Sequence, residues 1–255
     1  LSAVGERGEA LVVAREAVEA YRVLAEASPQ VYMPALARSL NNLASHLSGV
    51  GERGEALVVA REAVEAYRVL AEASPQAYMP ALARSLNNLA SRLSEVGERG
   101  EALRVAREAL EAYRVLAEAS PQAYMPDLAG ALNNLATFLS EVGDGSEALV
   151  VAREAVEAYR VLAEASPQAY MPALARSLNN LAAFLSGVGE RGEALRVARK
   201  ALEAYRVLAE ASPQAYRPDL ARSLNNLANC LSEVGESEKA LELKREARQL
   251  ADDLP

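Results

Sequence analysis

A short segment that begins with glycine and ends in Ala-Leu returns every 46 residues along this 255-residue chain. It starts at Gly5, Gly51, Gly97, Gly143, Gly189 and Gly235, and four of the six copies read GERGEAL. A fixed period of this length indicates one supersecondary unit stacked on copies of itself, in which each unit contacts only its neighbours. We therefore expect residues 1–255 to form one repeat array rather than a globular domain around a single core.

Each unit contains two segments with helical periodicity. In the first, leucines follow one another three or four residues apart, at Leu82, Leu86, Leu89 and Leu93. We expect this first helix to open at Pro80, because proline suits a first turn and disfavours helix at the residue before it. Gly97 is expected to end it as a left-handed cap. A second helix then starts at Glu101 and stops near Ser120, so the sequence predicts antiparallel helix pairs.

The two ends of the chain differ from the internal units. Leu1–Gly5 aligns with Leu47–Gly51, so we expect the chain to begin at the tail of a first helix whose body is missing. That would leave one face of the Glu9–Ala27 helix bare, and the N-terminal end would either lie inside a longer protein or result from processing. Residues 238–254 are expected to form a C-terminal capping helix at a native end. There, Lys244, Arg248 and Ala251 stand where the second unit has Ala60, Val64 and Tyr67.

The stretch from Leu86 to Leu110, LNNLASRLSEVGERGEALRVAREAL, resembles a tetratricopeptide repeat. The residues that carry the resemblance are Leu86, Leu89, Ala90, Leu93, Gly97, Ala102, Ala106 and Ala109. The unit is longer than the family's usual 34 or so residues, and its SLNNLA core is similar to the kinesin-light-chain-like subclass. It also resembles arrays joined to signalling NTPases or caspase-like modules in bacteria. Armadillo and HEAT units are the structural alternative, but they need different helix counts or signature residues.

The resemblance implies an all-α fold: a right-handed superhelical solenoid of about eleven helices, five complete first helices and six second helices. It also implies a protein or peptide ligand on the concave face lined by the first helices. We expect a non-catalytic scaffold, the C-terminal sensor or interaction part of a larger cytoplasmic bacterial protein. The alternatives are a spacer or self-assembling element, with self-association through the uncapped N-terminal edge, and a designed repeat protein.

Three rows of residues recur on the side of the first helix opposite its leucines. The first row is the second asparagine of each LNNLA: Asn42, Asn88, Asn134, Asn180 and Asn226. The second is an arginine row interrupted by Gly130: Arg38, Arg84, Arg176 and Arg222. The third changes from unit to unit and reads His46, Arg92, Phe138, Phe184 and Cys230. All three are candidate peptide-binding positions.

Each row has a functional and a structural interpretation. Asparagine amides match the donor and acceptor of a peptide main chain, and arginine pairs with carboxylate or phosphate. Such an asparagine ladder is what the resemblance implies. Alternatively, both rows hold neighbouring units together, and the adjacent asparagines, such as Asn87, lie nearer the seam between helices. The third row mixes incompatible chemistries, which predicts a solvent-facing or groove-facing position. These side chains would then determine ligand selectivity. Alternatively, they vary without function on a solvated surface.

Composition excludes several other functions. The net charge of −8 gives no attraction for nucleic acid or anionic lipid, and no apolar run reaches the length of a membrane span. One histidine, His46, and one cysteine, Cys230, in different units cannot form a catalytic pair or a metal site together. Gly143–Ser146 is interpreted as a turn, with Ser146 capping the next helix. We therefore expect no enzyme activity, no metal and no cofactor, and the lone cysteine fits a reducing compartment.

Overall fold

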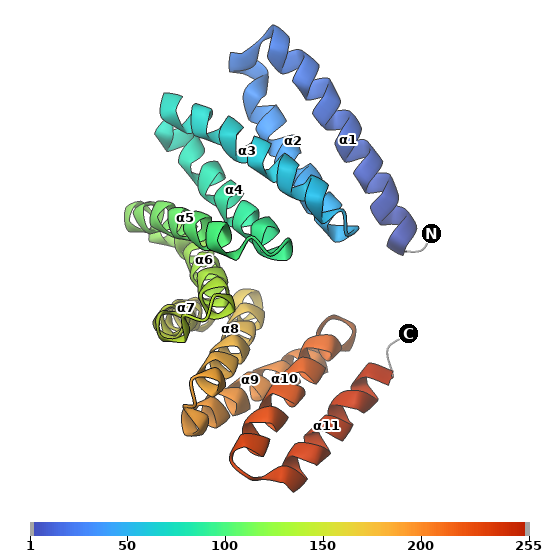
Figure 1. Ribbon diagram of the computed structural model, residues 1–255, viewed down its shortest axis with the longest axis vertical. Coiled ribbons are helices and arrows are strands. Elements are labelled where there is room, and N and C mark those ends of the chain that lie inside the picture. Colours follow the sequence, from blue (N-terminus) through green and yellow to red (C-terminus); the bar gives the residue numbers. More distant parts are fainter. Residues whose placement is uncertain (1–2, 253–255) are drawn as a thin grey trace. The chain divides into compact units, whose positions relative to one another are not determined.

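The computed structural model describes the backbone of residues 3–252 and the side chains of residues 8–250, and these residues form eleven α-helices and no strand (Figure 1). The first helices are α2 (Pro29–Gly49), α4 (Pro75–Glu95), α6 (Pro121–Glu141), α8 (Pro167–Gly187) and α10 (Pro213–Glu233). The second helices are α1 (Ala3–Ala27), α3 (Arg53–Ala73), α5 (Arg99–Ala119), α7 (Gly145–Ala165), α9 (Arg191–Ala211) and α11 (Ser237–Asp252). The predicted all-α fold and its helix count are confirmed.

The helices pack in chain order within two compact units, Leu1–Phe138 and Leu139–Pro255. In the first unit α1 packs on α2, α2 on α3, α3 on α4, and α4 on α5. In the second, α7 to α11 follow one another in the same way. Successive first helices also touch directly, α2 against α4 and α8 against α10. Leucine and alanine fill the space between helices, so the core is a chain of small interfaces rather than one centre.

The recurring glycine ends each first helix as predicted. Gly97 has a φ of +83°, a conformation that glycine adopts without steric cost. Its N–H donates to the Ser94 carbonyl at 2.9 Å, and the N–H of Glu98 donates to the Leu93 carbonyl at 2.9 Å. These two bonds are the Schellman pattern, which satisfies the last carbonyls of a helix. At the fourth copy of this turn Asp144, rather than Ser146, caps the following helix, and its side chain accepts from the Glu147 N–H at 3.1 Å.

The first helices begin earlier than predicted. α4 starts at Pro75, so Pro80 lies inside the helix and does not open it. The break in the chain is at Ser74, whose extended φ of −149° is the conformation favoured before a proline. Because proline has no N–H group, Pro80 removes one hydrogen-bond donor from α4. It lies near the start of the helix, where this loss disrupts the helix less than at its centre. The Pro-Gln-Ala-Tyr-Met segment is therefore the first turn of the helix.

The N-terminal segment also differs from its internal counterparts. α1 runs without interruption from Ala3 through Gly5, where the alignment with Gly51 predicts a turn. The other turns donate their N–H groups to the last carbonyls of a preceding first helix. No such helix precedes Gly5 in the described part of the chain. Leu1 and Ser2 lie outside the described residues.

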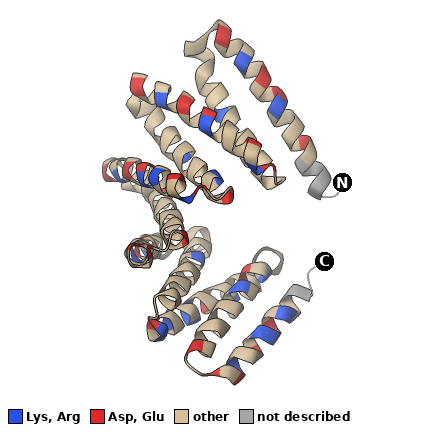
Figure 2. Ribbon diagram, viewed as in Figure 1, with Lys and Arg blue, Asp and Glu red and all other residues tan. Residues whose placement is uncertain are grey.

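Ion pairs link successive second helices at a spacing of 40 residues. Figure 2 shows how charges of both signs line α1 and α3. The pairs are Arg15–Glu55 and Arg22–Glu62 at 2.6 Å, Arg61–Glu101 at 2.7 Å, Arg68–Glu108 at 2.9 Å, Arg153–Glu193 at 2.6 Å and Arg206–Glu246 at 3.3 Å. Exposed ion pairs contribute about 0.2–1 kcal/mol each to stability. Their main effect is therefore to align each second helix with the next one along the array.

The last helix has a polar face where its counterparts are apolar. Lys244 and Arg248 are exposed, whereas their equivalents Ala60 and Val64 are buried. α11 is described as far as Asp252, and residues 253 and 254 of the predicted capping helix lie outside the described residues. The side chain of Ala251 lies outside the described residues. A capping role for α11 stays a prediction.

Candidate functional site

The second asparagine of each first helix has two kinds of environment. Asn134 donates through Nδ2 to Oδ1 of Asn87 at 3.2 Å, so it joins α6 to α4. Asn42, Asn88 and Asn226 have no hydrogen-bond partner among the residues that the structure describes. Asn42 is exposed and the other two are half-buried. Asn134 therefore links two neighbouring first helices. The amides of Asn42, Asn88 and Asn226 are not used in such a link.

The first asparagines Asn41, Asn87 and Asn179 lie in the seam between successive first helices, as predicted. Asn41 and Asn179 are buried and accept through Oδ1 from the hydroxyls of Ser85 and Ser223, each at 3.1 Å. Asn225, which no further first helix follows in the described chain, is exposed. The Nδ2 groups of Asn41 and Asn179 are buried and lack partners within the described residues. Sequence reasoning missed the serine donors, although SLNNLA repeats with the period.

The arginine row lies beside tyrosine hydroxyls of the second helices. Burial raises the pKa of Tyr67, while the nearby charges of Arg84 and Arg38 and a hydrogen bond from Arg84 oppose the shift. In the compact unit Leu139–Pro255, burial raises the pKa of Tyr205 to about 12. The negative charge of Asp219 raises this pKa further, whereas the positive charges of Arg222 and Arg176 lower it. All four arginines are exposed. Arg84 and Arg222 thus hydrogen-bond to Tyr67 and Tyr205, whereas Arg38 and Arg176 act on these tyrosines only through their charge.

Arg222 and Asp127 show how single substitutions change this row. Arg222 also forms an ion pair with Asp219, which is alanine in most other units. In the third unit Gly130 replaces the arginine, and burial raises the pKa of the neighbouring Asp127 carboxyl. Arg84 opposes that shift. The row therefore loses its positive charge at Gly130, in the third repeat.

The variable row is only partly where the sequence predicts it. His46 is exposed, but Phe138 is 6% exposed and Cys230 3% exposed, and Phe184 is half-buried. Arg92 is largely buried and pairs with Glu95 at 2.8 Å. Phe138 and Cys230 are therefore buried rather than solvent-facing, and ligand binding by this row stays a prediction.

The reason is the position of this row in the seam. Cys230 lines a pocket of about 290 Å³ between α8 and α10, so its side chain faces the preceding first helix. The other lining residues are Ala183, Ser186, Gly187, Asn226, Asn229 and Glu233. His46 is exposed because no first helix precedes α2 in the described chain. Burial at this row thus depends on a neighbour, which the residue type alone does not reveal.

Cys230 is expected to react slowly with thiol reagents. Burial raises the pKa of its thiol, and the charge of Glu233 adds to the shift, so less thiolate is present at a given pH than for a free cysteine. A disulfide reagent at pH 8 should modify the native chain at least about tenfold more slowly than the urea-unfolded chain. The matched control carries Cys230→Ser with His46→Cys, which moves the thiol to the exposed equivalent position. Equal native rates for the two chains would contradict the buried placement.

The described residues show no group of three His, Cys, Asp or Glu side chains that could hold a metal ion. No helix among them is long and apolar enough to cross a membrane. The polar groups that converge on the first helices are amides, guanidiniums and hydroxyls. Groups of these kinds are able to form hydrogen bonds and ion pairs with a ligand.

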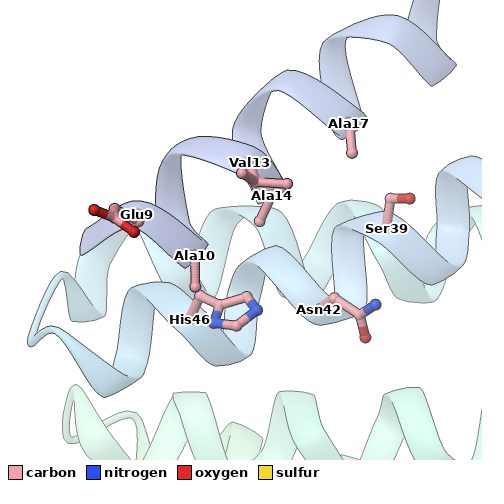
Figure 3. Close-up of a pocket in the computed structure, with 8 residues that line it drawn as sticks. All are labelled: Glu9, Ala10, Val13, Ala14, Ala17, Ser39, Asn42 and His46. Atoms are coloured by element: carbon pink, nitrogen blue, oxygen red, sulfur yellow. The ribbon is translucent and has the colours of Figure 1, made fainter. Parts of the chain in front are cut away.

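A second hollow lies at the N-terminal edge, between α1 and α2. It has a volume of about 510 Å³ (Figure 3). Glu9, Ala10, Val13, Ala14 and Ala17 line it from α1, and Ser39, Asn42 and His46 line it from α2. No first helix of the described chain covers this side of α1, and the missing half-unit before it stays a prediction.

Family models named tetratricopeptide repeat match residues 36–74, 82–121, 128–166 and 173–253. No curated protein matches the sequence. BtubC from P. vanneervenii has a similar structure, with a TM-score of 0.74 and 22% identity over 96% of this chain and 91% of that one. A putative kinesin light chain from Podosopora anserina with nearly identical repeats gives 0.63 and 18%, over 84% and 94%. YrrB, described as having an unusual peptide-binding site, gives 0.51 and 20%, over 93% and 95%.

Proposed function

The chain belongs to the tetratricopeptide repeat family, and we propose on this premise that it is a non-catalytic scaffold that binds a peptide on the face formed by its first helices. That face is the concave face expected of the superhelix. We further propose that the array is the C-terminal sensor or interaction part of a larger protein in the cytoplasm of a bacterium. The resemblance to signalling arrays supports this role.

The unused amides of Asn42 and Asn88 are the observation that carries the proposal. Each lies four residues after an exposed arginine, Arg38 and Arg84 respectively, so amide and guanidinium share one side of each helix. An extended peptide has one N–H and one C=O per residue, which an asparagine amide matches. An acidic side chain of the peptide would pair with the arginine. YrrB, a relative in fold, is itself described as having a peptide-binding site.

The test uses peptides selected from a random library on the wild-type chain. Replacing both Asn42 and Asn88 by Ala should weaken their binding by about tenfold, because each lost neutral hydrogen bond contributes about 0.5–1.5 kcal/mol. Affinity is measured by fluorescence anisotropy, and circular dichroism checks the fold. Val58→Ala, on the exposed face of α3, is the control and should bind normally. Unchanged affinity in the double variant would refute the amide ladder.

A second candidate function is a spacer or self-assembling element without a peptide ligand. The uncovered edge of α1 and α2 favours it, since an apolar groove on a surface is a surface for association. Light scattering over a range of chain concentrations separates the two candidates. A chain that stays monomeric at high concentration rules out self-assembly through this edge.

A further inference from the structure

We propose that the pocket between α8 and α10 binds the guanidinium group of an arginine side chain of a peptide ligand, with the Glu233 carboxylate as its partner. The proposal rests on the peptide-binding function proposed above and assigns a chemical class to one side chain of the ligand. Its basis is a comparison of two seams within this chain, α2 against α4 and α8 against α10. Equivalent positions of the two seams carry different residues.

In the seam between α2 and α4, a carboxylate has a cationic partner from its own helix. Glu95 accepts through Oε2 from the Ser48 hydroxyl at 3.0 Å, and its Oε1 lies 2.8 Å from Nη2 of Arg92. The side chain of Arg92 is 18% exposed, so its guanidinium lies largely within the seam. Both oxygens of Glu95 therefore have a partner, and the chain itself supplies the positive charge.

The seam between α8 and α10 keeps the carboxylate and the hydroxyl but lacks the guanidinium. Three repeats later, the equivalents of Ser48, Glu95 and Arg92 are Ser186, Glu233 and Cys230. Oε1 of Glu233 accepts from the Ser186 hydroxyl at 2.5 Å. Glu233 forms no ion pair with any residue that the structure describes. Its second oxygen is therefore available to a cation that the chain does not supply.

A cavity lies beside this carboxylate. The pocket of about 290 Å³ is lined by both Glu233 and Cys230. Cysteine is much smaller than arginine, so the exchange leaves room where the guanidinium of Arg92 lies in the other seam. Pockets for drug-sized molecules have volumes of about 300–1,000 Å³. This pocket is slightly smaller, which suits a single side chain of a ligand.

The polar side chains of the pocket that lack partners are able to accept hydrogen bonds. The lining residues include one carboxylate and no Lys, Arg or His. The amides of Asn226 and Asn229 have no hydrogen-bond partner among the described residues, and their oxygens add acceptors to the carboxylate. A guanidinium has only N–H donors, which match these acceptors. The set is too small for Ca²⁺, which takes about six to eight oxygen ligands.

The charge of Glu233 acts on the wall of the pocket. Burial raises the pKa of the Cys230 thiol, and the negative charge of Glu233 raises it further. The carboxylate therefore disfavours a second negative charge at Cys230, and the same interaction attracts a positive one. Because Cys230 is the chain's one cysteine, its reactions report the electrostatic potential in the pocket.

Two thiol reagents of opposite charge measure this potential in the 255-residue chain. The cation is aminoethyl methanethiosulfonate and the anion is sulfonatoethyl methanethiosulfonate. At low ionic strength the ratio of cation rate to anion rate at Cys230 should exceed that of the urea-unfolded chain by at least about tenfold. The ratio does not depend on the amount of thiolate, because both reagents attack the same thiol.

Glu233→Gln should lower this ratio about tenfold, because it removes the charge beside the thiol. The matched control is Glu210→Gln, which removes the same charge from an exposed position of α9 that does not line the pocket. It should leave the ratio within about twofold. Equal effects of the two substitutions would show that the net charge of the chain, and not the pocket, selects the cation.

Occupation of the pocket is measured as protection of Cys230 from the uncharged reagent methyl methanethiosulfonate. N-acetylargininamide should slow this reaction in a saturable way. N-acetylcitrullinamide, which has a similar shape without the charge, should not. Glu233→Gln should raise the concentration for half-protection about threefold, the effect expected of an exposed ion pair. The proposal is overturned if neither compound protects Cys230, or if both protect it equally.

Peptides selected on the wild-type chain connect the pocket to the peptide-binding function. They should contain an arginine whose exchange for citrulline weakens binding about three- to tenfold. Cys230→Arg, which restores the arrangement seen at Arg92, should remove this difference, whereas the control Cys230→Ser should keep it. Circular dichroism checks that both variants fold.

The outcomes separate this proposal from the peptide-binding function. If peptides bind through Asn42 and Asn88 but exchange of their arginines for citrulline has no effect, the function stands and the assignment of the pocket fails. If N-acetylargininamide protects Cys230 but no peptide is selected, the peptide-binding function fails. The pocket would then bind a free guanidinium compound.

Discussion

Leu93→Ala is expected to lower the free energy of unfolding by about 2–5 kcal/mol, the range for a leucine deleted from a packed core. Leu93 is completely buried, as are its equivalents Leu47, Leu139 and Leu185. It lies at the end of α4, directly before the turn that leads to α5. The large effect follows because the cavity removes contacts to both helices at once and the surrounding backbone cannot close around it.

Urea unfolding measures this loss, and hydrogen exchange locates it. Because each repeat contacts only its neighbours, protection should fall most in α4 and α5 and least in α9 and α10. Val69→Ala is the control, since Val69 is 60% exposed on α3, and it should change stability by less than about 0.5 kcal/mol. Equal destabilisation by the two substitutions would contradict the packing described for Leu93.

Gly97→Ala is expected to destabilise the chain by about 1–2 kcal/mol, the cost of a left-handed conformation for a residue with a Cβ atom. Gly97 has a φ of +83°, and nothing lies within 4 Å of the position that a Cβ would take. The strain is therefore conformational rather than steric against a neighbour.

A second glycine of the same turn gives the opposite result. Gly100 is helical, at the start of α5, and also has open space around it. Gly100→Ala should stabilise the chain by about 0.5 kcal/mol, because alanine loses less backbone entropy on folding. Thermal unfolding of both variants tests the sign. If both destabilise the chain, the difference in backbone conformation between the two glycines does not control the turn.

The repeat unit was predictable because its signals are local. Leucines at spacings of three and four indicate a helix whatever the neighbours do, and a glycine after the last leucine indicates its end. The start of the first helix was not predictable, because each unit has two prolines at which the helix could begin. Pro75 and Pro80 both suit a first turn, and only the backbone of Ser74 shows that the first of them opens the helix.

The candidate site was less predictable, because the burial and hydrogen bonding of its residues depend on contacts with a neighbouring unit. Cys230 and His46 occupy equivalent positions, and one is buried while the other is exposed. Asn134 bonds to Asn87, whereas the equivalent Asn88 has no partner in the described structure. The repeat period shows which residues belong to a row. The contacts across the seam determine which of them have free polar groups for a ligand. Binding by these rows stays a prediction.

The 40-residue ion pairs and the serine–asparagine bonds of the seam have a consequence for how such a gene changes. Because these contacts recur between units, an in-frame loss or gain of 46 codons joins surfaces that already fit each other. Misaligned recombination between near-identical repeats would therefore yield a longer or shorter array without requiring a new interface to evolve. The number of repeats becomes a heritable variable that selection can adjust independently of the fold.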